Sequence, residues 1–245
     1  MSLFQSKSKG YLGVDIGAGG IKVLELRPGG VRGKLWTYGY SERAPEEIGQ
    51  DWLAQPQASG AHLKAICAKA RVTGLTAVTA LPIPAVFSTV LTIAPVPAKE
   101  LKAAVEWEAK KLVPFPLEQV KLDWRILKSV KTEKGADQSS TVLLTAAPKS
   151  IIEKYLALAK AAGLTLVALE TEAFALIRAL LGADPTPTVL LDIGSVKSNI
   201  LIVDSAIPML TRSIDVGGQK YTQAMAQLLN VSLSKAEAMK RDVSA

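Results

Sequence analysis

Alternating apolar and polar residues predict strands in the first forty positions of the chain. The segments YLGVDIG, IKVLELR and KLWTYGYSER follow one another between residues 10 and 43, and the glycine pair Gly19-Gly20 separates the first two. Runs of β-branched and aromatic residues bounded by glycine are typical of strands joined by tight turns. The pattern therefore predicts a meander of three strands, followed by a loop over 44–58.

Helical spacing begins after this loop. In HLKAICAKA the apolar residues recur every three or four positions, which predicts a helix. The next segment, LTAVTALP, is a short apolar run, and Pro82 cannot donate a hydrogen bond to a sheet. We expect a buried strand that ends there and completes a first layered unit.

A second unit is predicted from about residue 86. FSTVLTIA has the composition of a strand, and the apolar positions over 101–112 trace one helical face until Pro114 forbids continuation. VKLDWRILKSV alternates, TEKGADQSS is a polar loop, and STVLLTAAP is a further strand. SIIEKYLALAKAAG is a helix that Gly163 closes at its C-terminal cap. The order of elements indicates an α+β subdomain.

The remaining sequence returns to alternating strands and helices. LTLVALE predicts a strand, TEAFALIRALLG a helix that ends at Gly182, and DPTPT a rigid linker. TVLLDIGSVKSNILIVD and PMLTRSIDVGG continue the strand pattern, and a helix is expected from about Tyr221 to Leu229. The last residues, VSLSKAEAMKRDVSA, are typical of the start of another helix.

Composition narrows the class of protein. The chain has 245 residues, of which 49% are hydrophobic, but no uncharged apolar run is long enough for a membrane span, and MSLFQSKSKG lacks the core of a secretion signal. A cytoplasmic address is expected. The single Cys67 and single His62 exclude a disulfide framework and the usual zinc sites. Chemistry therefore has to depend on carboxylates, lysines, backbone amides or a bound ion.

The net charge of +7 does not indicate nucleic acid as a partner. The basic residues are scattered along the chain, and only 5% of residues are aromatic, which leaves few platforms for base stacking. A solvated surface is the preferred interpretation, with mild attraction to phosphorylated small molecules or acidic headgroups as the alternative.

An internal repeat carries the chemical information. GVDIGAGGIKVLEL and LLDIGSVKSNILIVD share the order apolar strand, Asp-Ile-Gly, small or polar residues and apolar strand, so that Asp15 matches Asp192 and Gly17 matches Gly194. A glycine-containing turn directs successive N–H groups into a nest for phosphate oxygens, and carboxylates attract Mg²⁺ that is also bound by phosphates. Two ordinary hairpins would have the same pattern. GAGGIK does not fit a P-loop or a Rossmann fingerprint, because it leads into a strand.

These residues resemble a known family. The two Asp-Ile-Gly hairpins are similar to the phosphate loops of the actin-like ATPase superfamily, and TEAFALIRALLG lies where that superfamily has its connecting helix. VEWEAKKLVPFPLEQVKLDWRIL, VLLTAAPKSIIEKYLALAKAAGL and SIDVGGQKYTQAMA resemble the PilM family of type IV pilus assembly proteins, which is related to the cell-division protein FtsA. The stretch around Trp107 and Phe115 is the most specific part of this resemblance.

The resemblance implies an α/β fold of the actin-like (ribonuclease H-like) kind, with two lobes that bind a nucleotide between them. Subdomain 1A would comprise residues 1–84 and 166–184, with an α+β 1C insertion at 85–165. An incomplete subdomain 2A would follow over 185–230, and subdomain 2B would begin at 231–245. Family members continue past the last residue of this sequence. We therefore expect weaker nucleotide binding and some exposed apolar surface.

Site residues follow from the resemblance position by position. Asp15 and Asp192 would hold Mg²⁺ through water, and Glu172 would orient the attacking water. Glu237 and Lys240 resemble the helix that contacts ribose and purine. Each position also has a structural interpretation: a helix N-terminal carboxylate for Glu172, and an exposed i, i+3 ion pair for Glu237 and Lys240. The expected phosphate-binding residues are Gly17, Ala18, Gly19, Gly20, Lys22, Gly194, Ser195 and Val196, of which Lys22 is equally explained as an outward-facing strand residue.

The function implied by the resemblance is an ATP- and Mg²⁺-binding scaffold of the inner-membrane pilus platform, at most a slow ATPase. Its expected partner is the N-terminal cytoplasmic tail of PilN, in a groove between 1A and 1C, together with other platform proteins and the pilus motor ATPase. Peripheral membrane association would come through these partners. Two alternatives remain at this stage: a small-molecule kinase of the same superfamily, and a membrane-tethered filament similar to FtsA.

Overall fold

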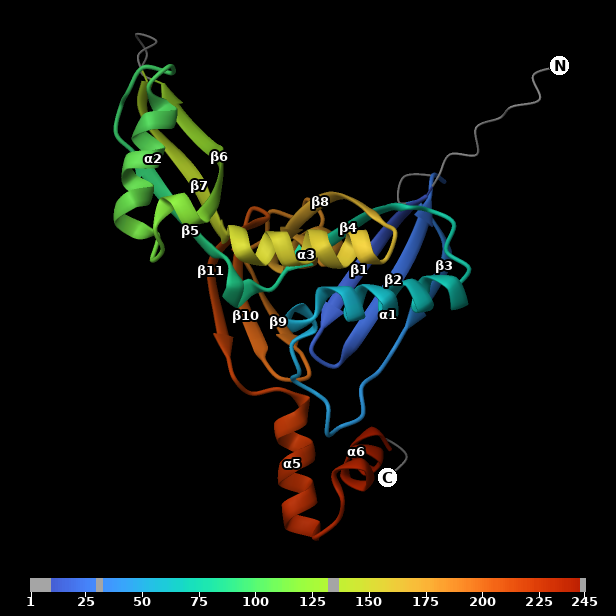
Figure 1. The fold of residues 1–245 in the computed structure, drawn as a ribbon. Helices are drawn as coiled ribbons and strands as arrows, with labels where there is room; N and C mark the ends of the chain where they lie inside the picture. Colours follow the sequence, from blue (N-terminus) through green and yellow to red (C-terminus); the bar gives the residue numbers. More distant parts are fainter. Residues whose placement is uncertain (1–9, 30–32, 132–136, 243–245) are drawn as a thin grey trace, which may run out of the picture.

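The computed structural model describes residues 10–29, 33–131 and 137–242, and over these residues the chain forms three β-sheets (Figure 1). A five-stranded sheet has the order β3-β2-β1-β4-β8, and two three-stranded sheets have the orders β5-β7-β6 and β11-β10-β9. The five-stranded sheet and the β9–β11 sheet lie in the two lobes, and the third sheet projects from one side (Figure 1). No helix in the described part of the chain is long and apolar enough to cross a membrane.

The predicted meander forms one half of the five-stranded sheet. β1, β2 and β3 are antiparallel, whereas β4 and β8 join β1 in parallel. The chain returns to the parallel strand β4 through α1, which begins at Pro56, inside the segment expected to be a loop. Proline suits the first position of a helix, because an N–H group there would have no hydrogen-bond partner within the helix. The strands are β1 (Tyr11–Gly17), β2 (Gly20–Arg27), β3 (Lys34–Tyr40), β4 (Thr76–Leu81) and β8 (Thr165–Thr171), and the helix is α1 (Pro56–Lys69).

The core of this lobe lies between the sheet and two helices. Leu12 and Ile21 are fully buried, and they belong to one apolar cluster with Leu63 of α1 and Leu158 of α3 (Lys149–Ala161). Alternate residues of β1 and β2 are buried because successive side chains of a strand point to opposite faces. The insertion expected over 85–165 also included α3, and this helix packs mainly in the core of the five-stranded sheet.

The opposite face of the five-stranded sheet is apolar and exposed. Tyr11, Leu24 and Tyr38 are 60%, 40% and 64% exposed, and Leu24 is the direct neighbour of Tyr38 across β2 and β3. Leu191 on β9 is 66% exposed as well. The expectation of exposed apolar surface is therefore met on both lobes.

The projecting sheet has its own core. Val105 and Ala109 of α2 pack with Ile93, Val142 and Leu144. The helix ends before Pro114, as predicted, and β7 already begins at Asp137, inside the segment TEKGADQSS, of which residues 132–136 lie outside the described part. The elements are β5 (Phe87–Ile93), α2 (Leu101–Leu112), β6 (Val120–Lys131) and β7 (Asp137–Pro148), with short 3-10 turns η1 (Trp52–Ala54), η2 (Ile83–Ala85) and η3 (Leu117–Gln119).

The connecting helix α4 leads from the first lobe to the second. The Thr171 hydroxyl accepts a hydrogen bond from the Phe174 N–H and caps its start, whereas Gly182 has a φ of 62° just past its end. Ala173 and Ile177 of this helix pack with Leu201. The elements of the second lobe follow: α4 (Glu172–Leu180), β9 (Thr188–Ile193), β10 (Ser198–Asp204), β11 (Ile207–Ile214), α5 (Gly218–Leu229) and α6 (Leu233–Arg241).

Helices α1 and α3 approach so closely at Gly60 that a side chain has no room there. A Cβ on Gly60 would lie 2.5 Å from the Ala161 Cβ and 2.6 Å from the Leu158 carbonyl oxygen. Gly60→Ala is therefore expected to lower the free energy of unfolding by about 1–3 kcal/mol, although alanine favours helix by up to about 1 kcal/mol. Chemical denaturation would measure the change. Gly13→Ala is the matched control, because its Cβ would meet the Leu24 oxygen at an ordinary 3.7 Å; equal losses at the two sites would contradict the packing argument.

Candidate functional site

One cleft between the two lobes collects every residue that the sequence analysis assigned to a site. The cleft has a volume of about 760 Å³, within the range of small-molecule sites. Its lining comes from β1, β2, α4, β9, α6 and the turns between strands. The predicted residues in the lining are Asp15, Gly17, Ala18, Gly19, Gly20, Lys22, Glu172, Asp192, Gly194, Ser195, Val196, Glu237 and Lys240. All of these residues therefore line the same cleft, and their roles in binding or catalysis stay predictions.

The turns of the two repeated hairpins lie against each other. A Cβ added to Gly19, in the turn between β1 and β2, would lie 2.3 Å from the Ser195 hydroxyl oxygen in the turn between β9 and β10. Gly20 has a φ of 156°, and its Cβ would lie 1.9 Å from the Ser41 carbonyl oxygen. The glycines therefore permit both the turn and the close approach of the lobes.

The second turn is held by the start of α5. The Gly218 and Gln219 N–H groups donate to the carbonyl oxygens of Gly194 and Ser195, at 2.9 and 2.8 Å. The Gly194 N–H, which was expected to bind phosphate, donates to the Lys197 carbonyl oxygen at 2.9 Å within the turn. Of the amides predicted in this turn, those of Ser195 and Val196 therefore remain the better candidates for an anion.

Each aspartate has a cross-strand partner at the same place in its repeat. Lys22 Nζ lies 2.8 Å from Asp15 Oδ2, and Asn199 Nδ2 donates to Asp192 Oδ2 at 2.9 Å. The strand registers pair Asp15 with Lys22 and Asp192 with Asn199. Asn199 is buried and accepts a hydrogen bond from the Ser213 hydroxyl, which orients its amide. The two halves of the cleft thus share one geometry but differ in charge.

Glu172 adds a third carboxylate, at the start of α4. Its Oε2 accepts a hydrogen bond from the Ile83 N–H at 3.0 Å. Burial raises the pKa of Glu172 to about 7, the Ile83 hydrogen bond opposes this shift, and the negative charges of Asp15 and Asp192 add to it. Near neutral pH this side chain exchanges a proton easily, which suits a group that orients or deprotonates water.

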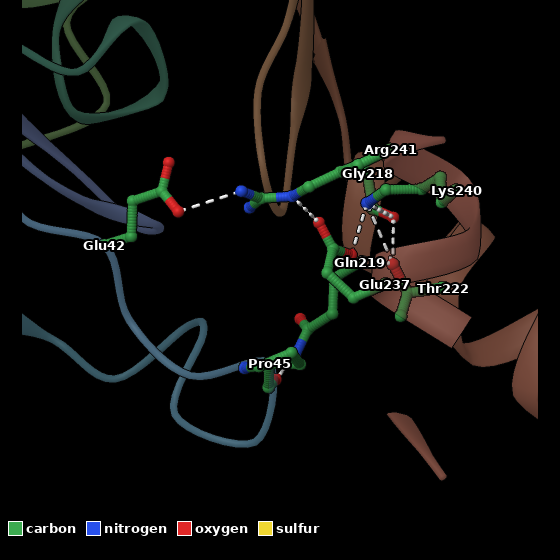
Figure 2. Close-up of polar contacts among 8 residues, drawn as sticks. All are labelled: Glu42, Pro45, Gly218, Gln219, Thr222, Glu237, Lys240 and Arg241. Atoms are coloured by element: carbon green, nitrogen blue, oxygen red, sulfur yellow. Dashed lines mark hydrogen bonds and ion pairs between the residues drawn. The ribbon is translucent and has the colours of Figure 1, made fainter. Parts of the chain in front are cut away.

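Polar groups of α5 and α6 close the far side of the cleft (Figure 2). Glu237 Oε2 lies 2.6 Å from Lys240 Nζ and also accepts from the Thr222 hydroxyl, whereas its Oε1 accepts from Arg241 Nε at 2.8 Å. Burial would raise the pKa of Glu237, but hydrogen bonds from Lys240, Thr222 and Arg241 outweigh it and lower the pKa to about 2. Lys240 also donates to the Gly218 carbonyl oxygen at 3.1 Å. Glu237 and Lys240 therefore form a mostly buried ion pair within a larger hydrogen-bond network. The alternative interpretation expected an exposed ion pair.

A segment that the sequence analysis expected to be the end of a strand up to residue 43 and a loop from residue 44 forms another wall of the cleft, because β3 already ends at Tyr40. We call residues 41–52 the strap. On one side it contacts the first turn, and on the other Gln219 Nε2 donates to the Ile48 carbonyl oxygen at 3.1 Å. Figure 2 shows the contact of the Gln219 side chain with Pro45 and the ion pair between Arg241 and Glu42, at 2.8 Å. Asn199 was missed too, although the repeat aligns it with Lys22. No comparable signal in the sequence indicates the strap.

The described residues do not enclose a metal ion with protein ligands alone. No group of three or more histidine, cysteine, aspartate or glutamate side chains within them is arranged for that purpose. Asp15 and Asp192 offer carboxylate oxygens from opposite lobes, and such a pair suits Mg²⁺ that keeps most of its water and binds phosphates.

The two-lobed architecture with mirrored hairpins defines the chain as a member of the actin-like class of folds, and solved structures agree. The chain is 17% identical to the ethanolamine utilization protein EutJ from Carboxydothermus hydrogenoformans, with a TM-score of 0.57. The match covers 95% of this chain and 61% of that protein. It is 14% identical to MreB 5 of Spiroplasma citri bound to AMPPNP, with a TM-score of 0.50 and coverage of 96% and 63%. At these identities the likeness shows the fold alone.

The family follows from two further comparisons. The chain belongs to the family of the type IV pilus assembly protein PilM, whose family model matches residues 13–244. A structure described as a PilM-PilN type IV pilus biogenesis complex is similar, with 29% identity and a TM-score of 0.78; the match covers 95% of this chain and 69% of that one. The expected family and the actin-like fold are confirmed.

The raised pKa of Glu172 predicts a pH-dependent stability. The folded protein keeps the proton up to about pH 7, whereas the unfolded chain releases it near 4.5, so the wild-type free energy of unfolding falls as the pH rises between these values. Glu172→Gln can still accept the Ile83 hydrogen bond and removes this dependence. Relative to wild type, the variant is expected to gain up to about 3 kcal/mol between pH 4.5 and 7.5.

Denaturation at a series of pH values would measure this gain. Glu153→Gln, an exposed position on α3, is the control and should leave the pH profile as in wild type. Parallel profiles for wild type and Glu172→Gln would show that burial does not raise the pKa.

Proposed function

We propose that this chain is an ATP-binding scaffold of type IV pilus assembly that receives the N-terminal tail of PilN. The observation that carries the nucleotide part is the meeting of two repeated Asp-Ile-Gly hairpins on one cleft, with Gly19 against Ser195. The partner part rests on membership of the PilM family and on likeness to a PilM-PilN complex.

Different residues of the cleft would contact different parts of the proposed nucleotide. The turns at Ala18 and Gly19 in one lobe and at Ser195 and Val196 in the other would contact the phosphates through backbone N–H groups. Lys22 would move its ammonium from Asp15 to a phosphate oxygen. Glu237 and Lys240, which now neutralise each other, would contact the nucleoside.

Asp15 and Asp192 would hold Mg²⁺ through water molecules, in agreement with their separate positions on the two lobes. The ion would neutralise charge on the phosphates when it is bound. Glu172 would orient a water molecule, and its partial protonation near pH 7 agrees with hydrolysis that is slow. ATP would then act mainly as a clamp between the lobes.

The proposed docking site of the PilN tail is the junction between the five-stranded sheet and the projecting sheet. Phe87 and Ile93 of β5 face α2, so the alternate residues, among them Ser88, face the opposite way. The Ser88 hydroxyl oxygen is buried and, within the described residues, has no hydrogen-bond partner. On the same sheet the Arg125 guanidinium lies 6.0 Å from the ring of Phe174 on α4. An extended peptide would pair its backbone carbonyl groups with the Arg125 guanidinium, and with the Ser88 hydroxyl once the side chains that cover it move.

Other platform proteins and the pilus motor ATPase would contact the scaffold in turn. Association with the inner membrane would be peripheral and would come through PilN. Within such an assembly, this chain would bind nucleotide in its cleft and the PilN peptide at a separate sheet.

Nucleotide binding is tested by calorimetry of Mg-ATP with the wild type and with Asp15→Asn. The variant is expected to bind about tenfold more weakly or worse, because it loses one charged contact to the hydrated ion. Asp204→Asn is the matched control, since Asp204 ends β10 outside the cleft lining and accepts a hydrogen bond from the neighbouring Ser205 hydroxyl. Equal affinities of Asp15→Asn and wild type would contradict the assigned metal position.

Peptide docking is tested with a labelled peptide of the PilN N-terminal sequence from the same organism, by fluorescence anisotropy with and without Mg-ATP. Arg125→Glu reverses the charge at the junction and is expected to weaken binding by about tenfold. Lys102→Glu on the outer surface of α2, 76% exposed, is the charge-matched control. Absence of binding by the wild type under both conditions would end the PilN proposal, and it would leave the nucleotide proposal standing.

A further inference from the structure

The strap fixes the first hairpin turn through two of the turn's carbonyl oxygens. The Arg43 backbone N–H donates to the Gly19 oxygen, and the Trp52 indole Nε1–H donates to the Gly17 oxygen, both at 2.9 Å. A peptide unit is planar and trans, so its N–H points opposite to its C=O. A hydrogen bond that holds the Gly17 oxygen towards the strap therefore directs the next N–H, that of Ala18, away from the strap.

Trp52 is itself held by two side chains that pack on its ring. The Arg43 guanidinium carbon lies over the ring, 3.6 Å from its centroid. The His62 imidazole stacks on the indole with centroids 5.3 Å apart and an angle of 23° between the planes. His62 Nε2 lies 2.9 Å from the Ser41 hydroxyl oxygen, which ties this stack back to the start of the strap. These contacts, together with the hydrogen bond to Gly17, fix the orientation of the indole and the direction of its N–H.

We propose that Trp52 is a positioning residue for the phosphates of a bound nucleotide. It acts through the Gly17 carbonyl, so that the Ala18 amide faces the ligand before the ligand arrives, and Arg43 and His62 maintain the indole in the required orientation. This inference rests on the proposed nucleotide binding. It concerns the phosphate end of the ligand only, because the nucleoside-contacting residues Glu237 and Lys240 lie on α6 of the other lobe.

The test compares Trp52→Phe with Trp107→Phe. Phenylalanine keeps an aromatic ring beside Arg43 and His62 and removes the N–H donor together with part of the bicyclic indole. Trp107→Phe makes the same chemical change at a position that is 63% exposed on α2, outside the cleft lining. Calorimetry would give the affinities for Mg-ATP, Mg-ADP and adenosine. We expect Trp52→Phe to weaken both phosphorylated ligands about three- to tenfold, the scale of one neutral hydrogen bond, and to leave adenosine within about twofold.

A spectroscopic readout separates positioning from a general loss of structure. Mg-ATP is expected to change the tryptophan emission of the wild type and of Trp107→Phe, and this change should be largely lost in Trp52→Phe. Thermal unfolding of each variant would report its stability independently.

Each outcome decides the proposal. Affinities of Trp52→Phe equal to those of Trp107→Phe overturn it, and so does an equal weakening of ATP and adenosine, which would indicate a structural role alone. If the wild type binds Mg-ATP at no measurable level, the proposed function fails and this inference with it. If Trp52→Phe does not fold, Arg43→Lys replaces it: lysine keeps the charge and lacks the planar group stacked on the indole, and an unchanged affinity for Mg-ATP would overturn the proposal.

Discussion

The concentration of negative charge in one cleft is the constraint on which this structure depends. Asp15, Glu172 and Asp192 approach the same space from three different elements, and unpaired carboxylates in such a site would oppose folding. The protein relieves each one differently: Asp15 by an ammonium group, Asp192 by the neutral amide of a buried asparagine, and Glu172 by retention of a proton. A hydrated cation with its polyphosphate would replace these internal compensations, which gives the proposed ligand a physical reason to bind where the repeats meet.

Local patterns predicted most of the elements that carry the fold. The meander was readable because alternation, glycine turns and a proline stop all act within a few residues, and the positive φ of Gly163 and Gly182 at two helix ends follows from the same local rules. The expected loop over 44–58 places the start of α1 too late, because Pro56 fits a loop as well as the first turn of a helix. The expected boundaries also grouped α3 with the insertion over 85–165, whereas α3 packs in the core of the five-stranded sheet. An apolar stripe predicts a buried face, and it does not identify the partner.

The candidate site divides in the same way. The repeat located both hairpins and the carboxylates that follow them, because strand, aspartate and glycine turn are contiguous in sequence. The same repeat would also have identified Asn199, because Asn199 aligns with Lys22. The strap could not be identified in this way, since its contacts are made by backbone carbonyls and by side chains nearly two hundred residues away, as between Glu42 and Arg241. Composition marks such a segment as loop and gives no information on what its carbonyl groups accept.

The strap also bears on how the lobes are able to move. Its contacts with the second lobe include an ion pair with both side chains more than half exposed, worth at most about 1 kcal/mol. They also include hydrogen bonds from the Gln219 side-chain amide to carbonyl oxygens and an exposed hydrogen bond from the Ser234 hydroxyl to Glu46, and water can equally satisfy these groups. Its contacts with the first lobe are a stacked indole and two hydrogen bonds to the first turn. Because the contacts with the first lobe are the stronger ones, opening of the cleft would separate the strap from α5 and α6. The strap would stay bound to the first turn and keep the conformation of that turn. The first lobe would then meet a nucleotide with its amides already oriented, and the second lobe would close on both.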